Sequence, residues 1–156
     1  MAHYGRQVSM IIPLNLPKAK LKLTRKNGEV YVRCLIRQKD LVCTPEEWVR
    51  QHVIHYLISE KGVSIGRIAS EFSLEYNSRS KRADLVLFDE FGKPNMVVEC
   101  KAPEIPITEK VVHQIAQYNS QLNVDRLFLT NGLDHIFCEI DRENGKLIYH
   151  QEWPNW

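Results

Sequence analysis

Apolar residues recur along this chain at two spacings, and the two spacings predict two kinds of secondary structure. Short runs rich in Val and Leu occupy residues 83–89 and 96–101, and the segment 90–94 between them has the composition of a turn. Longer stretches that begin near Pro45 and Thr108 repeat apolar residues at helical spacing. The pattern therefore predicts two neighbouring strands, with one helix before them and one after them in the sequence.

The first helix has a clear start and a clear stop. Thr44 is a preferred N-cap residue, Pro45 suits the first helical position, and Glu47 lies where it completes a capping box. Apolar residues then recur until Lys61-Gly62, where the glycine ends the pattern. A second helix is expected from about 108 to 122, with an apolar stripe that comprises Val111, Ile115, Tyr118 and Leu122.

Further strands are expected on both sides of these elements. Asn27-Gly28 within 21–35 is the strongest short hairpin signal, so it predicts an N-terminal β-hairpin. Residues 77–82 are expected to form a loop that leads into the strand of Asp84. The remaining strands are expected at 68–76, 126–130 and 136–140. In the first of these strands the expected apolar face comprises Ile68, Phe72, Leu74 and Tyr76.

These elements predict an α/β fold with a mixed, mostly antiparallel central sheet, two main flanking helices and an N-terminal β-hairpin. The length of 156 residues, with 44% apolar and 26% charged residues, fits one domain of ordinary size. We expect this domain to span 18–156, after a lightly ordered arm at 1–17.

Composition excludes some functions and leaves others open. The net charge is only +2, so nucleic-acid binding cannot be inferred from the bulk charge and would need a local basic surface. The four cysteines show no Cys-x-x-Cys spacing, so neither a zinc site nor a redox pair is indicated. The N-terminus has no long apolar stretch that would suggest a signal peptide or a membrane anchor. We therefore expect a cytoplasmic protein without a membrane partner.

Three charged residues interrupt the two apolar strands. Asp84 opens one strand, and Glu99-Cys100-Lys101 closes the other. If the turn centres on Phe91-Gly92, residues whose numbers sum to 183 face one another, so Asp84 lies opposite Glu99, with Cβ atoms about 5 Å apart. Lys101 then shares their face, while Cys100 points into the core. Two carboxylates about 4 Å apart repel by roughly 4 kcal/mol at an effective dielectric of 20, and Mg²⁺ between them would reverse that sign.

The alternative is an ordinary set of surface charges. Asp84 would then lie at a solvent-facing strand end, and Glu99 and Lys101 would form a cross-strand salt bridge. A half-exposed strand should, however, alternate apolar and polar residues, and the runs Leu85-Val86 and Val97-Val98 do not. The lack of alternation therefore favours a buried site.

The pattern Asp84 followed by Glu99-x-Lys101 resembles the PD-(D/E)xK nuclease signature, although Ala83 stands where the proline of that signature would be. Gln114 and Tyr118 form the Gln-x-x-x-Tyr pair that is typical of the exonuclease-like branch. Similarity to the N-terminal nuclease domain of type I restriction endonuclease R subunits extends roughly from Leu14 to the C-terminus. Besides the motifs above, it includes the segments 44–51, 81–84 and 130–132. The resemblance implies a restriction-endonuclease-like fold.

The resemblance also implies Mg²⁺-dependent hydrolysis of DNA, with Mn²⁺ as a substitute cofactor. Asp84, Glu99 and the Cys100 carbonyl would hold the metal, and Lys101 would orient or deprotonate the attacking water. Gln114 and Tyr118 would support the site from the second helix. In such families an acidic residue of the first helix often reaches the metal, so Glu47 is a candidate, with Glu71 as its rival; a purely capping role for Glu47 is equally compatible with the sequence.

The partners follow from the same resemblance. Arg79, Lys81 and Arg82 precede Asp84 and are the expected DNA-backbone contacts, whereas the basic residues of 18–26 are expected to form a solvated face. Other subunits of a restriction system are possible partners. The sequence has no Gly-x-x-x-x-Gly-Lys-Ser/Thr loop, so ATP-driven translocation cannot belong to it. A stand-alone nuclease, a nuclease subunit, a non-catalytic DNA- or protein-binding module and a structural interaction protein all stay open.

Overall fold

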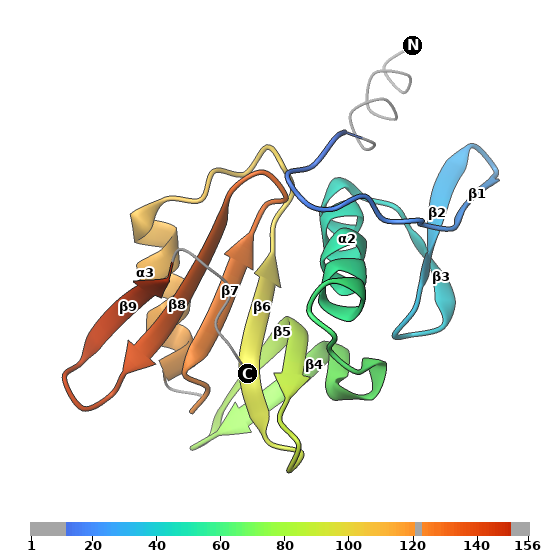
Figure 1. Ribbon diagram of the computed structural model, residues 1–156. Helices are drawn as coiled ribbons and strands as arrows, with labels where there is room; N and C mark the ends of the chain where they lie inside the picture. Colours follow the sequence, from blue (N-terminus) through green and yellow to red (C-terminus); the bar gives the residue numbers. More distant parts are fainter. Residues whose placement is uncertain (1–11, 121–122, 151–156) are drawn as a thin grey trace.

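A computed structural model describes residues 12–120 and 123–150 of the chain. Its central element is a six-stranded sheet with the strand order β4-β5-β6-β7-β8-β9 (Figure 1). The strands are β4 Ile68–Tyr76, β5 Arg79–Phe88, β6 Pro94–Cys100, β7 Arg126–Thr130, β8 His135–Asp141 and β9 Lys146–His150. The β6–β7 pair is parallel and the other pairs are antiparallel, which confirms the prediction of a mixed, mostly antiparallel sheet.

Helices α2 (Pro45–Ser59) and α3 (Glu109–Ser120) cover opposite faces of this sheet (Figure 1). One core cluster joins α2 to the face of Leu85, and it contains Val98 and Phe128 as well. A second cluster joins α3 to the opposite face, where Val86 and Val97 lie. The two predicted helices and their positions around the sheet are thereby confirmed.

The N-terminal hairpin is confirmed and proves to be part of a three-stranded sheet. Strands β1 (Leu23–Lys26) and β2 (Glu29–Cys34) are joined at Asn27-Gly28, whose φ angles of 50° and 80° suit a type I′ turn. A third strand, β3 (Lys39–Val42), pairs with β2 and was not expected. The strand is short, and its exposure pattern shows little of the alternation on which sequence reading depends.

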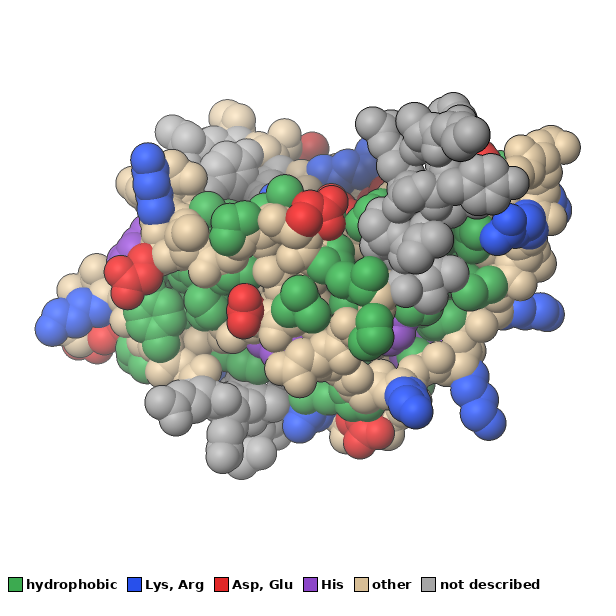
Figure 2. Space-filling view, turned by 90° about the horizontal axis from the view of Figure 1, so that it is seen from above, with side chains coloured by type: hydrophobic (Ala, Val, Ile, Leu, Met, Phe, Trp, Pro, Cys, Tyr) green, Lys and Arg blue, Asp and Glu red, His purple; other side chains and the backbone are tan. Residues whose placement is uncertain are grey.

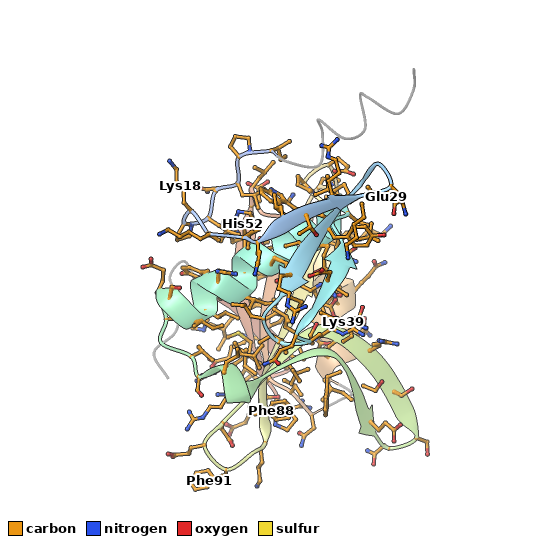
Figure 3. All side chains as sticks on the ribbon, turned by 90° about the vertical axis from the view of Figure 1, so that its right-hand side faces the viewer. Lys18, Glu29, Lys39, His52, Phe88 and Phe91 are labelled. Atoms are coloured by element: carbon orange, nitrogen blue, oxygen red, sulfur yellow. The ribbon has the colours of Figure 1, made fainter. Side chains whose placement is uncertain are left out.

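Helix α2 lies between the N-terminal sheet and the central sheet (Figure 3). One side packs against Val30, Val32 and Cys43 through Trp48, and the other side enters the α2 cluster of the central sheet. Because both sides are covered, polar residues of the helix are buried together with the apolar ones. The helix begins as predicted, with the Thr44 hydroxyl accepting the Glu47 N–H at 3.1 Å.

The secondary structure differs from the expectation in three further places. The loop expected at 77–82 is only the turn Asn77-Ser78, with φ angles of 50° and 63°, and β5 already begins at Arg79. The sequence hides this turn because it lacks a glycine. Strand β9 and the short 3₁₀ helix η1 (Ile65–Arg67) were not expected at all. Strand β9 lies at the sheet edge and none of its residues is fully buried, so its apolar signal is weak.

The segment 12–17, part of the expected lightly ordered arm, is attached to the domain. The Trp48 Nε1–H donates to the Ile12 carbonyl at 3.0 Å, and the Asn15 N–H donates to the Gly132 carbonyl at 2.7 Å. Leu14 and Leu16 pack against the α2 cluster. Residues 1–11 of the expected arm lie outside the described residues. Among the described residues, no helix is long and apolar enough to cross a membrane.

Gly132 offers a test of this attachment. Its φ is +87°, and a Cβ there would lie 2.8 Å from Leu14 Cδ2 and 3.1 Å from Val49 Cγ2. We expect Gly132→Ala to lower the free energy of unfolding by about 2–3 kcal/mol, because the left-handed conformation strains alanine and the Leu14 side chain must move. Gly145→Ala is the control, since its φ of +63° carries the same strain with nothing within 4 Å. Equal losses in urea denaturation would contradict the predicted steric contribution.

Candidate active site

The predicted register of the two charged strands is confirmed. Leu85 pairs with Val98 and Val86 pairs with Val97, so paired residue numbers sum to 183 in this stretch. The same register continued by one residue places Asp84 next to Glu99. The Asp84–Glu99 pair itself lies one residue beyond the ladder between these strands, so the shared face of the two carboxylates stays a prediction.

The sheet is irregular at this same level. Strand β4 pairs with β5 at Ser70–Leu85 and again at Phe72–Ala83, and the pair between them, Glu71 with Asp84, is missing from the ladder. Glu71 has a φ of +52°, which is unusual for a residue with a side chain. The irregular position lies beside the predicted site.

Both strands exchange faces at this irregular position. In β4, Ile68 belongs to the α2 cluster but Leu74 belongs to the α3 cluster, although both numbers are even. In β5, Leu85 faces α2 but Ala83 faces α3, although both numbers are odd. The single apolar face predicted for β4 is therefore wrong. A regular ladder would send Glu71 towards α3, whereas it contacts an arginine of α2.

Asp84 makes its contacts at the position where the β4–β5 ladder lacks a pair. Its Oδ2 accepts the Cys100 N–H at 2.8 Å, so the carboxylate takes the place of a backbone acceptor. Its Oδ1 lies 3.7 Å from Nη2 of Arg50, a residue of α2. The side chain keeps 20% of its surface exposed, so the carboxylate stays within reach of solvent.

Arg50 is surrounded by four carboxylates. Its guanidinium lies 3.2 Å from Glu46, 3.6 Å from Glu47, 3.4 Å from Glu71 and 3.7 Å from Asp84. The residue is only 6% exposed although it is charged. We refer to these five residues as the Arg50 cluster. Its ion pairs connect helix α2 with strands β4 and β5.

The electrostatics of the cluster reflect its mixed burial. Burial tends to lower the pKa of Arg50, but the negative charges around it, chiefly Glu47 and Asp84, raise the pKa above its ordinary value. Burial raises the pKa of Glu46, and the charge of Asp84 raises it further, while Arg50 and Lys101 act in the opposite direction. Glu46 therefore lies within electrostatic reach of Asp84 and Lys101.

Glu71 binds arginines from three different elements. Arg37, in the β2–β3 turn, donates to it at 2.8 Å, Arg50 of α2 at 3.4 Å, and Arg82 of β5 at 3.0 Å. Burial raises the pKa of Glu71, but the three arginines together outweigh this effect, so its pKa lies below the ordinary value. Through Arg37, the N-terminal sheet takes part in the same charge network.

The remaining predicted residues of β6 lie close to this network. Glu99 is 7% exposed, and it adjoins Cys100, whose N–H donates to the Asp84 carboxylate at 2.8 Å. Cys100 lies in the α2 core cluster, which confirms that it points into the core, and burial raises its pKa well above the ordinary value. The Lys101 N–H donates to the Thr130 carbonyl at 2.8 Å, and its side chain is half-buried.

Glu47 does not complete the expected capping box. Its N–H is capped by Thr44, but the Thr44 N–H donates to the Val42 carbonyl at 2.9 Å. The Glu47 carboxylate instead accepts from Gln51 Nε2 at 3.0 Å and lies beside Arg50. Both acidic residues of the first helical turn thus face the Arg50 cluster, and Glu46 is the more exposed of the two.

The other predicted site residues are less closely tied to the cluster. Gln114 is exposed on α3, where the buried stripe runs through Val112, Ala116 and Asn119 and is displaced by one position from the predicted stripe. Its role, like that of Tyr118, stays a prediction. The side chains of Tyr118, Arg79 and Lys81 lie outside the described residues, and the Arg82 side chain is 67% exposed.

Some basic residues of the N-terminal sheet contact acidic or aromatic residues of the same sheet. Lys and Arg side chains lie at the right-hand end of the molecule, over this sheet (Figure 2). Arg33 lies 3.6 Å from Asp40, and Lys26 lies 6.0 Å from the ring centre of Tyr31. These local contacts fit the expectation of a solvated face.

Sequence reasoning missed Arg50 and Glu46. The available signal was the spacing Glu46-x-x-x-Arg50, which places opposite charges on one side of a helix. That signal is common on exposed helices, so it could not reveal a buried cluster. The partners Glu71 and Asp84 come from other elements and are brought to Arg50 only by the fold.

The residues present suit a hard divalent cation in chemistry but are not arranged around one. Asp84 and Glu99 offer carboxylate oxygens, which Mg²⁺ and Mn²⁺ prefer. Within 12–120 and 123–150, no three His, Cys, Asp or Glu side chains form a group ready to hold a metal ion. A cationic guanidinium is already present among the carboxylates.

The fold and the site define a mixed α/β domain with a charged site between its first helix and its central strands. The family model described as "Type I restriction enzyme R protein N terminus" matches residues 45–154, and the chain belongs to this family. The predicted resemblance is confirmed, although the match begins at Pro45 rather than near Leu14 and so leaves out the N-terminal sheet.

The chain was also compared with curated proteins and with solved structures. No curated protein matches the chain. Among solved structures, a candidate nuclease belonging to DUF820 from Anabaena variabilis is similar with a TM-score of 0.44 and 13% identity, over 88% of this chain and 80% of that one.

Glu71 allows the charge network to be tested through pH. Because its pKa in the folded protein lies below 4.5, its contribution to stability is fully present above that pH and is lost as pH falls through the lowered value. We expect Glu71→Gln to lower the free energy of unfolding at neutral pH by about 1–2 kcal/mol, and the difference to disappear in acid. Urea denaturation from about pH 7 to about pH 3 measures this.

Glu71→Gly separates charge from backbone strain in the same experiment. It loses the same carboxylate but accommodates the φ of +52°, so it should be more stable than Glu71→Gln by about 1 kcal/mol. A loss that does not change with pH would contradict the ionic role. A glycine variant less stable than the glutamine variant would contradict the strain.

Proposed function

We propose that this domain is a metal-dependent nuclease that hydrolyses phosphodiester bonds of DNA, as a PD-(D/E)xK enzyme does. The observation that carries the proposal is the hydrogen bond from the Cys100 N–H to Asp84 Oδ2 at 2.8 Å, which holds the Asp84 carboxylate against the residue that lies between Glu99 and Lys101 in the sequence. Membership in the family of R protein N termini supports a restriction-type role. The acidic residues at the start of α2 border the same site.

The proposed roles follow from the chemistry of each side chain. Asp84, Glu99 and the Cys100 carbonyl would hold Mg²⁺ or Mn²⁺, which supplies Lewis-acid stabilisation of the phosphate and a lowered pKa of water. Lys101 would orient the attacking water or, in its neutral amine form, take up the proton of that water, a role that its flexible side chain with a tunable pKa permits. The Cys100 N–H fixes one oxygen of Asp84, so that the other oxygen can face the reacting groups.

The DNA would approach from the solvent side of β5. Arg82 is the described basic residue there, and its guanidinium is exposed while one amino group stays bonded to Glu71. Such contacts would bind phosphates without reading sequence. Arg79 and Lys81 would extend this contact, and Gln114 and Tyr118 would support the site from α3. Other restriction-system subunits would then supply the remaining activities, in the cytoplasm.

A second candidate function is a binding module that retains the fold without turnover. It is favoured by the Arg50 cluster, in which an internal cation neutralises the carboxylates that a nuclease would present to a metal. Such a module would bind DNA or a protein partner through the basic residues around Glu71.

The nuclease proposal is tested by Glu99→Gln, which removes one negative charge and keeps the side-chain shape. With Mg²⁺ or Mn²⁺, the wild-type domain should cleave supercoiled DNA, and Glu99→Gln should lower the rate at least about a hundredfold, because cation binding and charge stabilisation are lost. The measurement is a gel-based cleavage time course, with DNA binding followed by fluorescence anisotropy.

Glu139→Gln is the matched control, because Glu139 is paired with Arg126 at 3.0 Å on β7 and β8, away from the site. It should cleave at the wild-type rate. Cleavage that survives in Glu99→Gln would rule out the proposed site. A wild-type domain that binds DNA but never cleaves it, even with Mn²⁺, would support the binding module instead.

A further inference from the structure

The proposed metal site already contains a positive charge of its own. We propose that Arg50 is a positioning residue that serves as the internal counter-ion of this site and competes with the divalent cation for its carboxylates. This inference rests on the proposed function, because it concerns the same site. It adds a property that the family membership does not assign, namely a metal affinity held down by one residue of the first helix.

Arg50 is held by many weak contacts rather than by one strong one. Its distances to the four carboxylates range from 3.2 to 3.7 Å, longer than the spacing of about 2.8 Å in a strong charge-assisted pair. No single carboxylate binds it in a bidentate manner at these distances. A guanidinium shared in this way can give up one partner and keep the others.

The positions of the four partners suggest which contact would be lost. Asp84 is the proposed metal ligand, and it is also the most distant partner. Glu46 and Glu71 are more exposed, with 43% and 30% of their side-chain surfaces accessible, and they lie closer to Arg50. A cation bound at Asp84 would therefore repel the guanidinium towards Glu46 and Glu71, which can retain it.

The burial of Arg50 makes the competition effective. At 6% exposure the guanidinium is poorly screened by water and salt, so its repulsion of a nearby cation is stronger than on an exposed surface. Removal of the charge should have two opposite effects. The metal-free protein loses the cation that four carboxylates share, although Glu71 keeps Arg37 and Arg82, while the metal-bound protein loses a repulsion.

The test compares Mn²⁺ binding to variants of the whole chain by isothermal titration calorimetry, without DNA. Arg50→Met keeps an unbranched stem but removes the charge, and Arg50→Gln provides a polar neutral replacement if the methionine variant does not fold. We expect either neutral variant to bind Mn²⁺ at least about tenfold more tightly than wild type. Saturating Mn²⁺ should also raise the melting temperature of the neutral variant more than that of wild type.

Two controls test whether the effect depends on the positive charge of residue 50 and on the location of that charge in the cluster. Arg50→Lys retains the charge and should keep the wild-type affinity within about threefold. Arg126→Met removes an equally charged residue that is paired with Glu139 at 3.0 Å outside the cluster, and it should leave the affinity unchanged. Asp84→Asn in the Arg50→Met background should abolish the gain, which locates the Mn²⁺ at this site.

The outcomes distinguish this inference from the proposed function. If wild type binds Mn²⁺ and the neutral variants bind it equally or more weakly, the competition is refuted while the nuclease site stands. If neither wild type nor the neutral variants bind Mn²⁺ up to about 10 mM, a range that covers weak divalent sites, both proposals fail. The competition is supported if the neutral Arg50 variants bind Mn²⁺ more tightly than wild type and the two controls do not.

Discussion

The attraction between one buried arginine and four carboxylates is the interaction on which this domain's central region depends. Arg50 contributes the only positive charge of that five-membered cluster, and the cluster joins the first helix to two strands of the sheet. Buried charges of one sign are costly unless they are neutralised. The positions of α2, β4 and β5 therefore have to satisfy charge as well as apolar packing.

The sheet meets this requirement by an irregularity in its ladder. Regular alternation would direct Glu71 and Asp84 towards α3, away from Arg50. The left-handed backbone at Glu71 and the missing pair with Asp84 exchange the faces of both strands at one level. Local strain of this kind persists only where surrounding contacts determine it. Here the three arginines bonded to Glu71 supply those contacts.

The parts of the fold that were predictable depend on neighbours in sequence. The turn at Asn27-Gly28, the cap at Thr44 and the register between Leu85 and Val98 all follow from residues within one hairpin or one helical turn. The start of β5 was missed because Asn77-Ser78 lacks a glycine. Arg50 was missed for a different reason, since its distant partners are assembled only when α2 packs on the sheet.

An ion pair connects the N-terminal sheet to the Arg50 cluster, although the family match begins after this sheet. The match starts at Pro45, the first residue of α2, and so excludes β1 to β3. Arg37 nevertheless reaches from the β2–β3 turn to Glu71, with the shortest of the three arginine contacts to that carboxylate. A ligand that drew Glu71 or Arg50 to new partners would therefore also alter how the N-terminal sheet is held against the domain. If substrate binds at the Arg50 cluster as proposed, its binding and the placement of this sheet would be linked through the Glu71 carboxylate.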